Sequence, residues 1–214
     1  MKKQLLIELP YCPPVSFFVL YLHFETVCFD IWANYEKASY RNRCHIAGAN
    51  GLLRMSIPLQ RGKHQHRAFK EVLIHNESAW QVLHWTSICS AYRQSPYFEF
   101  FEDSLYPVFH QQQPKLFDFN LALFEWIIQQ LRFEKKWACT TSYESEPAPG
   151  IMDLRNCLAP NPEKSKIPFS FRLPVYHQVF DDRYDFLPDL SVLDLLFNEG
   201  PKAAPLIREA SRTI

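Results

Sequence analysis

A basic stretch with hydrogen-bonding neighbours lies near the start of the chain, in the run NYEKASYRNRCHIAGANG, residues 34–51. Lys37, Arg41 and Arg43 stand beside one acidic residue in this run, although the whole chain carries 23 basic and 23 acidic residues. A guanidinium is a planar fork of donors suited to carboxylate or phosphate, and lysine adds a compact positive charge. The run also offers polar neighbours: Asn34, Tyr35, Tyr40 and Asn42. The pattern predicts either a binding site for an anionic group or a solvated basic face, since charge runs are usually surface.

Helical spacing would divide this stretch between two faces. In a helix, Lys37, Tyr40 and Arg41 would share one face, at positions i, i+3 and i+4. Arg43 would point about 160° away from Arg41. We therefore predict that Arg41 binds an anion while Arg43 braces the fold.

Two further predicted helices carry polar side chains where their patterns call for apolar ones. Asn120 lies near the centre of the apolar arc of a helix predicted over residues 115–133, and His84 lies within one predicted over 78–94. Burying an amide without partners costs about 1–3 kcal/mol, so a hydrogen-bond partner is expected. Both positions are consistent with a satisfied core network or with the lining of a pocket.

Tyr11 comes just after a strand predicted over residues 4–9. The carboxyl ends of strands are where α/β sheets usually present ligand sites. A ring and a hydroxyl at that edge would suit a pocket, and a structural turn between prolines is the alternative.

Several function classes lack their sequence motifs. With only five glycines, the chain has no G-x-G-x-x-G and no P-loop, and it contains neither G-x-S-x-G nor H-E-x-x-H. His64 and His66 are two residues apart, but no acidic or cysteine partner is close in sequence, so an exposed loop is favoured over a metal site. The six cysteines form no C-x-x-C pair, which indicates reduced thiols. We predict no metal and no cofactor.

Composition and apolar runs indicate which cellular location and which classes of partner to expect. The formal net charge is zero, so no global field attracts nucleic acid or a membrane surface. No apolar run approaches the length of a membrane span, and the N-terminus lacks the apolar region of a signal peptide. A cytoplasmic protein with a small-molecule ligand is the expectation, and the oligomeric state is open.

The order of predicted elements indicates an α/β fold. Strands are predicted at 4–9, 26–31, 52–60, 69–74 and 135–143. Helices are predicted at 14–24, within 34–51, and at 78–94, 97–113, 115–133 and 190–201. Ser78 with Gln81, and Ser191 with Asp194, have capping-box spacing. We expect a single domain over residues 1–214, with a mixed sheet, a central cluster of helices and a Pro-rich irregular segment at 144–174 before a C-terminal helix.

Several ordered blocks of the sequence resemble the WbqC-like family of bacteria, in its Bacteroidetes-type form. They are PYCPPVSFF, NYEKASYRNRC, LLRMSIPL, WQVLHWTSICSAYRQSPYFEFF, LFDFNLALFEWI and LSVLDLLFNEGP. The Tyr-Arg-Asn-Arg block stands at residues 40–43 and the Trp-Gln-x-x-His-Trp block at 80–85, whereas Glu8-Leu9 replaces the early His-Gln pair of many members. Because a merely solvated face would not make such a signature, the resemblance favours the anion site.

The resemblance implies a function in surface polysaccharide (O-antigen) biosynthesis. It implies a transferase that moves a small acyl or aminoacyl group, such as glycyl, to an amino sugar or sugar nucleotide. His84 is the predicted general base, since histidine titrates near neutrality. The residues predicted to bind substrate are Tyr11, Asn34, Tyr35, Lys37, Tyr40, Arg41, Asn42, Arg43, Trp85, Tyr92 and Asn120. A non-catalytic module that binds a nucleotide sugar or an anion, and an interaction subunit of a polysaccharide assembly, are the alternatives.

Overall fold

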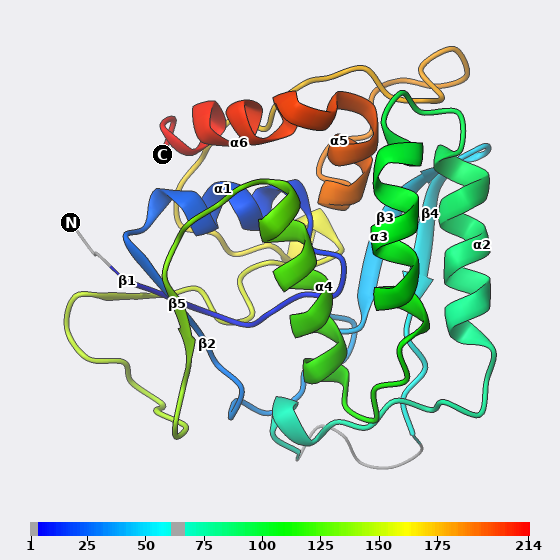
Figure 1. The fold of residues 1–214 in the computed structure, drawn as a ribbon. Coiled ribbons are helices and arrows are strands. Elements are labelled where there is room, and N and C mark those ends of the chain that lie inside the picture. Colours follow the sequence, from blue (N-terminus) through cyan, green and yellow to red (C-terminus); the bar gives the residue numbers. More distant parts are fainter. Residues whose placement is uncertain (1–3, 61–66) are drawn as a thin grey trace.

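A parallel sheet of four strands forms one half of the fold, with strand order β5-β2-β1-β6 (Figure 1). A computed structural model describes residues 4–60 and 67–214. The parallel strands are β1 (Gln4–Ile7), β2 (Thr26–Phe29), β5 (Trp137–Cys139) and β6 (Ile151–Asp153). An antiparallel hairpin, β3 (Arg43–Gly48) with β4 (Gly51–Ser56), forms a second sheet. The predicted α/β class is confirmed, with the parallel and antiparallel pairings divided between two sheets.

Helices surround the sheets. They are α1 (Val15–His23), α2 (Trp80–Tyr92), α3 (Phe98–His110), α4 (Leu116–Gln130), α5 (Val192–Glu199) and α6 (Ala203–Ser211). Helices α2, α3 and α4 form the predicted central cluster, visible in green and teal in Figure 1. Within the described ranges, no helix combines the length and apolar character that crossing a bilayer requires.

Aromatic rings fix α1 and α4 against one face of the parallel sheet. The ring of Phe124 from α4 lies 5.1 Å from that of Phe29 on β2. Phe17 from α1 lies 6.3 Å from both of them. All three side chains are fully buried. Burying such rings is the dominant stabilising term here, since each removes a large apolar area from water.

The stretch before β3 is not helical, so the predicted helix within residues 34–51 is wrong. Residues 37–42 form turns and bends, and strand β3 begins at Arg43. The Ser39 hydroxyl donates to the Glu36 carbonyl at 2.7 Å, and Ala38 adopts a positive φ of 59°. Serine and asparagine side chains offer the backbone such local bonds in competition with a helix. Lys37 and Arg41 therefore do not share a helix face.

Three other predicted elements differ from the structure. The predicted strand at 69–74 is a 3₁₀ turn, Phe69–Glu71, followed by isolated bridges. The Pro-rich segment 144–174 contains β6, which pairs with β1 through three residues. The last helix does not end the fold, because α6 follows Gly200 through a short 3₁₀ turn. The loop with His64 and His66 lies outside the described residues.

Only one of the two predicted capping boxes caps its helix. Ser191 caps α5, since its hydroxyl accepts from the Leu193 amide at 3.3 Å. Ser78 instead donates to the His75 carbonyl, and α2 begins two residues later. Neither capping box is completed by its second residue. Gln81 donates to the Phe109 carbonyl at 2.7 Å, and the Asp194 carboxylate accepts from Tyr92 and Gln178.

Candidate functional site

Polar residues stand at the carboxyl ends of all four parallel strands. Glu8 follows β1, Asp30 follows β2, Thr140 follows β5 and Asp153 closes β6. Because parallel strands end at the same edge of a sheet, these side chains gather where α/β folds present ligand sites. We call these four residues, with Arg155, the sheet-edge site.

Asp30 accepts hydrogen bonds from four residues at this site. Its side chain is 1% exposed, and Oδ2 accepts from Arg155 Nη1 at 2.7 Å. Oδ1 accepts from the backbone amides of Trp32 and Ala33 at 2.9 Å and from the Thr140 hydroxyl at 3.2 Å. A buried carboxylate with this many donors is fixed in place.

Arg155 ties the strand ends to the loop after β5. Its Nε and Nη2 donate to the Asp153 carboxylate at 2.9 and 2.7 Å. Nη1 and Nη2 also donate to the carbonyls of Glu144 and Ser145, at 2.9 and 3.3 Å. The hydrogen bonds to Asp153, and after them the one to Asp30, raise the pKa of the guanidinium against the opposing effect of burial, so the group stays charged. The network therefore holds the loop over the edge of the sheet.

A cleft of about 240 Å³ opens beside this network. Its lining residues are Gln4, Leu6, Cys28, Asp30, Cys139, Thr140, Thr141, Ser142, Glu144, Pro147, Ile151 and Arg155. The cleft combines three hydroxyl side chains, two carboxylates, one guanidinium and two thiols. This donor and acceptor set suits a polar ligand such as a sugar.

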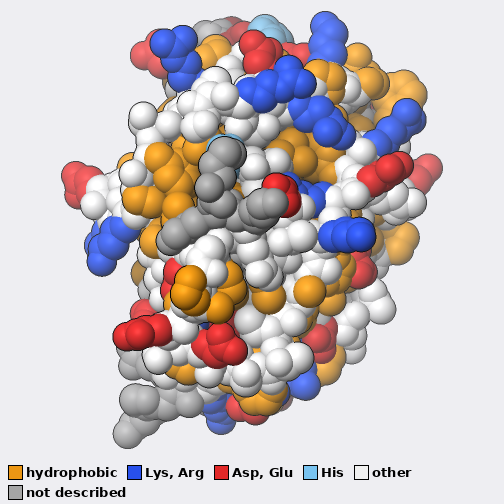
Figure 2. All heavy atoms as spheres, turned by 90° about the vertical axis from the view of Figure 1, so that its left-hand side faces the viewer, with side chains coloured by type: hydrophobic (Ala, Val, Ile, Leu, Met, Phe, Trp, Pro, Cys, Tyr) orange, Lys and Arg blue, Asp and Glu red, His pale blue; other side chains and the backbone are white. Residues whose placement is uncertain are grey.

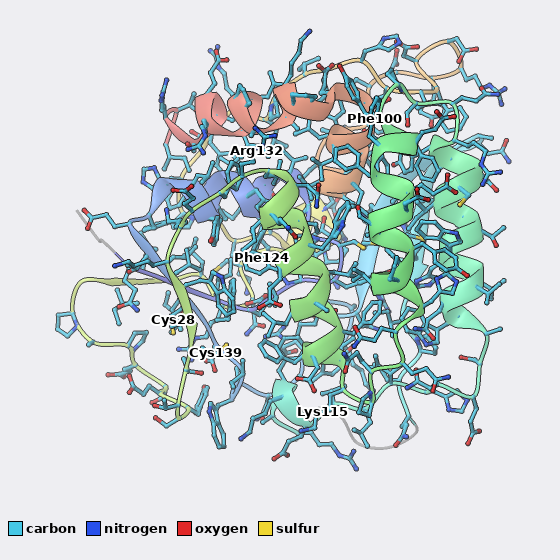
Figure 3. The ribbon with its side chains drawn as sticks, viewed as in Figure 1. Cys28, Phe100, Lys115, Phe124, Arg132 and Cys139 are labelled. Carbon is cyan, nitrogen blue, oxygen red and sulfur yellow. The ribbon has the colours of Figure 1, made fainter. Side chains whose placement is uncertain are left out.

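The two thiols of the cleft lie on neighbouring strands. Figure 3 labels Cys28 on β2 and Cys139 on β5. Burial raises the pKa of both thiols, and the charges of Asp30 and Glu144 raise that of Cys28 further. A thiol must be ionised to act as a nucleophile, so both groups are unreactive near neutral pH.

Charge near the sheet is mixed. Figure 2 shows both acidic and basic side chains on the side of the molecule that carries the N-terminal strand. Across the described ranges, no group of three or more His, Cys, Asp or Glu side chains is placed to hold a metal ion. The side chains at this edge therefore offer hydrogen-bonding groups of both signs rather than a field of one sign.

Arg41 lies behind the sheet edge and is fully buried. Its Nη2 donates to the Asn156 side chain at 2.9 Å, and its Nη1 lies 3.8 Å from Glu8 Oε1. The Asn156 amide donates to the other Glu8 oxygen at 2.9 Å. Within the described residues, Arg41 Nε and Nη1 and Glu8 Oε1 have no hydrogen-bond partner. The anion beside Arg41 is thus an internal carboxylate.

His84 and Tyr11, which lie far apart in sequence, meet in the interior. The Tyr11 hydroxyl and His84 Nδ1 are 2.8 Å apart. Burial lowers the pKa of His84 to about 4, while a hydrogen bond from the imidazole to the Ser56 backbone opposes the shift. Burial also raises the pKa of Tyr11 far above its usual value. Both groups are therefore neutral at pH 7, and His84 lines neither the cleft nor the larger hollow beside α2.

Asn120 and Tyr92 make hydrogen bonds in the core, although Oδ1 of Asn120 has no partner within the described residues. Asn120 Nδ2 donates to the carbonyls of Leu9 and Arg41 at 3.2 and 2.8 Å. The Tyr92 hydroxyl donates to Asp194 at 2.8 Å and accepts from the Ala47 amide at 3.1 Å. Each residue joins segments that are distant in sequence, as expected of a core network.

The other predicted binding residues fall into three groups by exposure. Asn34, Lys37 and Arg43 are exposed. Tyr35 and Tyr40 are buried, and the Tyr35 hydroxyl donates to Asn42 at 2.8 Å. Trp85 is half-buried and lines the larger hollow beside α2. The structure thus joins Tyr11 with His84 and Arg41 with Asn120, and leaves Lys37 and Arg43 in solvent.

Sequence reasoning missed Asp30, Thr140 and Arg155. A signal for Asp30 existed, because it comes directly after the apolar residues of a predicted strand. Arg155 follows β6, a three-residue strand inside the Pro-rich segment, and no pattern marks a strand that short.

Comparisons with known proteins identify one matching family and one full-length relative. The model of the WbqC-like protein family matches residues 10–157, which include Asp30, Thr140 and Arg155. The chain is 26% identical over 228 residues to the uncharacterized protein Rv1507c of Mycobacterium tuberculosis. That alignment covers 97% of this chain and 98% of the relative. No solved structure matches the chain.

Proposed function

Because the chain belongs to the WbqC-like family, we propose that it is a transferase of bacterial surface-polysaccharide biosynthesis. It moves a small acyl or aminoacyl group, such as glycyl, to an amino sugar or sugar nucleotide. The observation that supports this proposal is a cleft that runs along the parallel sheet to the strand ends at Asp30 and Thr140 and is lined by hydroxyls, carboxylates and Arg155. Such a cleft matches the polar groups of a sugar.

The transfer is direct in this proposal. The acceptor amine attacks the carbonyl of an acyl or aminoacyl thioester, so the C–N amide bond forms as the C–S bond breaks and the donor leaves as its thiolate. Cys28 and Cys139 take no part because they stay protonated. Glu144 takes the amine proton, because it lines the cleft and its charge acts on Cys28. Asp30 is less suited, since four donors already occupy its oxygens.

His84 has a different role in this proposal from the one predicted by sequence. The resemblance predicts it as the general base, and that role stays a prediction. Its lowered pKa makes it a weak base, and its Nδ1 is engaged by Tyr11. We therefore assign it to positioning Tyr11 behind β1.

Product analysis tests the proposal. The protein is incubated with UDP-linked amino sugars and a panel of acyl and aminoacyl thioesters, and mass spectrometry detects an acylated sugar. Glu144→Gln should lower turnover by about 10²–10⁴-fold, the usual contribution of a general base. Glu146→Gln is the matched control, because this exposed neighbour does not line the cleft. Full turnover in Glu144→Gln would remove that residue from the mechanism.

A non-catalytic module that binds a nucleotide sugar is the second candidate. It is favoured by one observation: Asp30, Asp153 and Arg155 are already bonded to one another. A binder would be stabilised against unfolding by RT ln(1 + [L]/Kd) and would form no product. Thermal shift with the same sugars, without acylation of any of them, would favour this candidate over the transferase.

A further inference from the structure

A second hollow, of about 720 Å³, lies beside the end of α2. It shares no lining residue with the cleft at the sheet edge. Its walls are residues 85–94, residues 179–183 in part, and Ala49 at the tip of the β3–β4 hairpin. We call this hollow the α2 groove. Its volume is in the range of small-molecule sites.

One wall of the α2 groove is a mixed helix face. The wall carries Trp85, Thr86, Cys89, Ser90, Arg93 and Gln94. The spacing of Trp85, Thr86, Cys89 and Ser90 puts them on one side of α2, and Arg93 and Gln94 follow directly after the helix. An indole ring, two hydroxyls and an amide thus stand side by side. Such a face can bury C–H surface and bond hydroxyl groups at once.

The opposite wall supplies an arginine with free donors. Arg183 is exposed, and its guanidinium carbon lies 5.5 Å from the centre of the Phe180 ring. Among residues 4–60 and 67–214, its side chain makes no hydrogen bond or ion pair. Stacking on the ring orients the planar fork, so little freedom is lost when a ligand binds.

In the part of the chain that the structure describes, two arginines and no acidic residue line the α2 groove, but acidic residues lie beside each arginine. Arg93 pairs with Glu102 at 3.2 Å, and Arg183 follows Asp181 and Asp182 in sequence. A phosphate site needs an excess of basic groups, which this arrangement does not give. We propose that the α2 groove binds a short neutral oligosaccharide. Sugar rings pack on Trp85, and their hydroxyls bond with Arg183, Ser90 and Gln94. The proposal stands whether or not the sheet edge is catalytic.

Titration with tri-N-acetylchitotriose tests the proposal on the full chain. Backbone amide signals followed by NMR should shift for residues 86–94 and 179–183. Arg183→Ala should weaken binding about fivefold or more, which is the loss of one hydrogen bond. Arg172→Ala is the matched control, because Arg172 is also exposed in the segment before α5 and does not line the groove. It should bind within about twofold of the wild type.

Two results would overturn the proposal. The first is that neither tri-N-acetylchitotriose nor maltotriose shifts these amides at about 10 mM, a concentration that detects millimolar affinity. The second is that inorganic phosphate shifts them and the sugars do not, which would make the groove an anion site. Because binding alone is read out, a failure of the transferase assay leaves this result unaffected.

Discussion

Two arginines flank the carboxyl edge of the parallel sheet and differ in how many of their donors are hydrogen-bonded. Arg155 is 7% exposed and lines the cleft, and all three of its nitrogens donate hydrogen bonds. Arg41 is fully buried, and only its Nη2 donates. Among the described residues, the hydrogen bonding of Arg155, beside the cleft, is complete, whereas that of Arg41, in the interior, is not.

The difference indicates what each arginine does. A buried charge with unmatched donors lowers stability unless its neighbours compensate, and its removal leaves the partner charge stranded. Arg41 and Glu8 are therefore coupled parts of the core. Arg155 reaches the cleft, so its network shapes a surface that a ligand can touch. The sequence prediction placed the binding role on Arg41, and the geometry favours Arg155.

Removing Arg41 should have the largest effect on stability. Arg41→Ala leaves Glu8 buried with one partner fewer, and we expect a loss of about 3–5 kcal/mol in the free energy of unfolding by urea. Arg43→Ala is the control, because this exposed neighbour should change stability by less than about 0.5 kcal/mol.

A double variant sharpens this test of the interior pair. Arg41→Met with Glu8→Gln removes both charges, and it should recover part of the lost stability. An Arg41→Ala protein as stable as the wild type would show that the interior network carries no such coupling.

His84 should make interior stability depend on pH. Folding lowers its pKa from 6.5 to about 4, so the unfolded chain binds the proton first as pH falls. The contribution is complete above pH 6.5 and is lost as pH falls towards 4, on the order of 3 kcal/mol. His84→Gln should flatten this dependence in urea unfolding between pH 4 and 7.

The measured quantity is the difference between His84→Gln and the wild type at each pH. Burial raises the pKa of the Asp189 carboxyl to about 6, so that group stabilises the fold as pH falls and opposes His84. Subtraction removes the Asp189 term, because it is common to both proteins. Parallel curves for the two proteins would contradict the buried, neutral state of His84.

Long apolar patterns were enough to predict much of the fold. Helix α4 follows the arc that includes Phe124 and Asn120, and α1 follows the Pro13–Pro14 pair as expected. The sequence predicts a helix in the stretch before β3 because helical spacing fits this run. Its short polar side chains favour turns instead. Strand β6 has three residues and gains its stability from pairing with β1, which local sequence cannot reveal.

The sheet-edge site was harder to predict than the core. Tyr11 and His84 meet across 73 positions, and Asp30 and Arg155 across 125. Spacing along the chain carries no information about such pairs. The rule that strand ends gather ligands pointed to Tyr11, which proved to be buried, whereas Asp30 stood at the neighbouring strand end.

Replacing Arg155 should have the smallest effect on stability and a local effect on motion. Arg155→Lys keeps the charge but loses the fork that joins Asp153, Asp30 and the Glu144 carbonyl, so we expect a loss of about 1–2 kcal/mol. Amide hydrogen exchange should rise in residues 140–150 and stay unchanged in α4, because within the described ranges Arg155 bonds to carbonyls of this loop and makes no bond to α4. Arg172→Lys is the control for an exposed arginine. If exchange in the loop stays as slow as in the wild type, Arg155 does not hold the wall of the cleft, and the contrast with Arg41 fails.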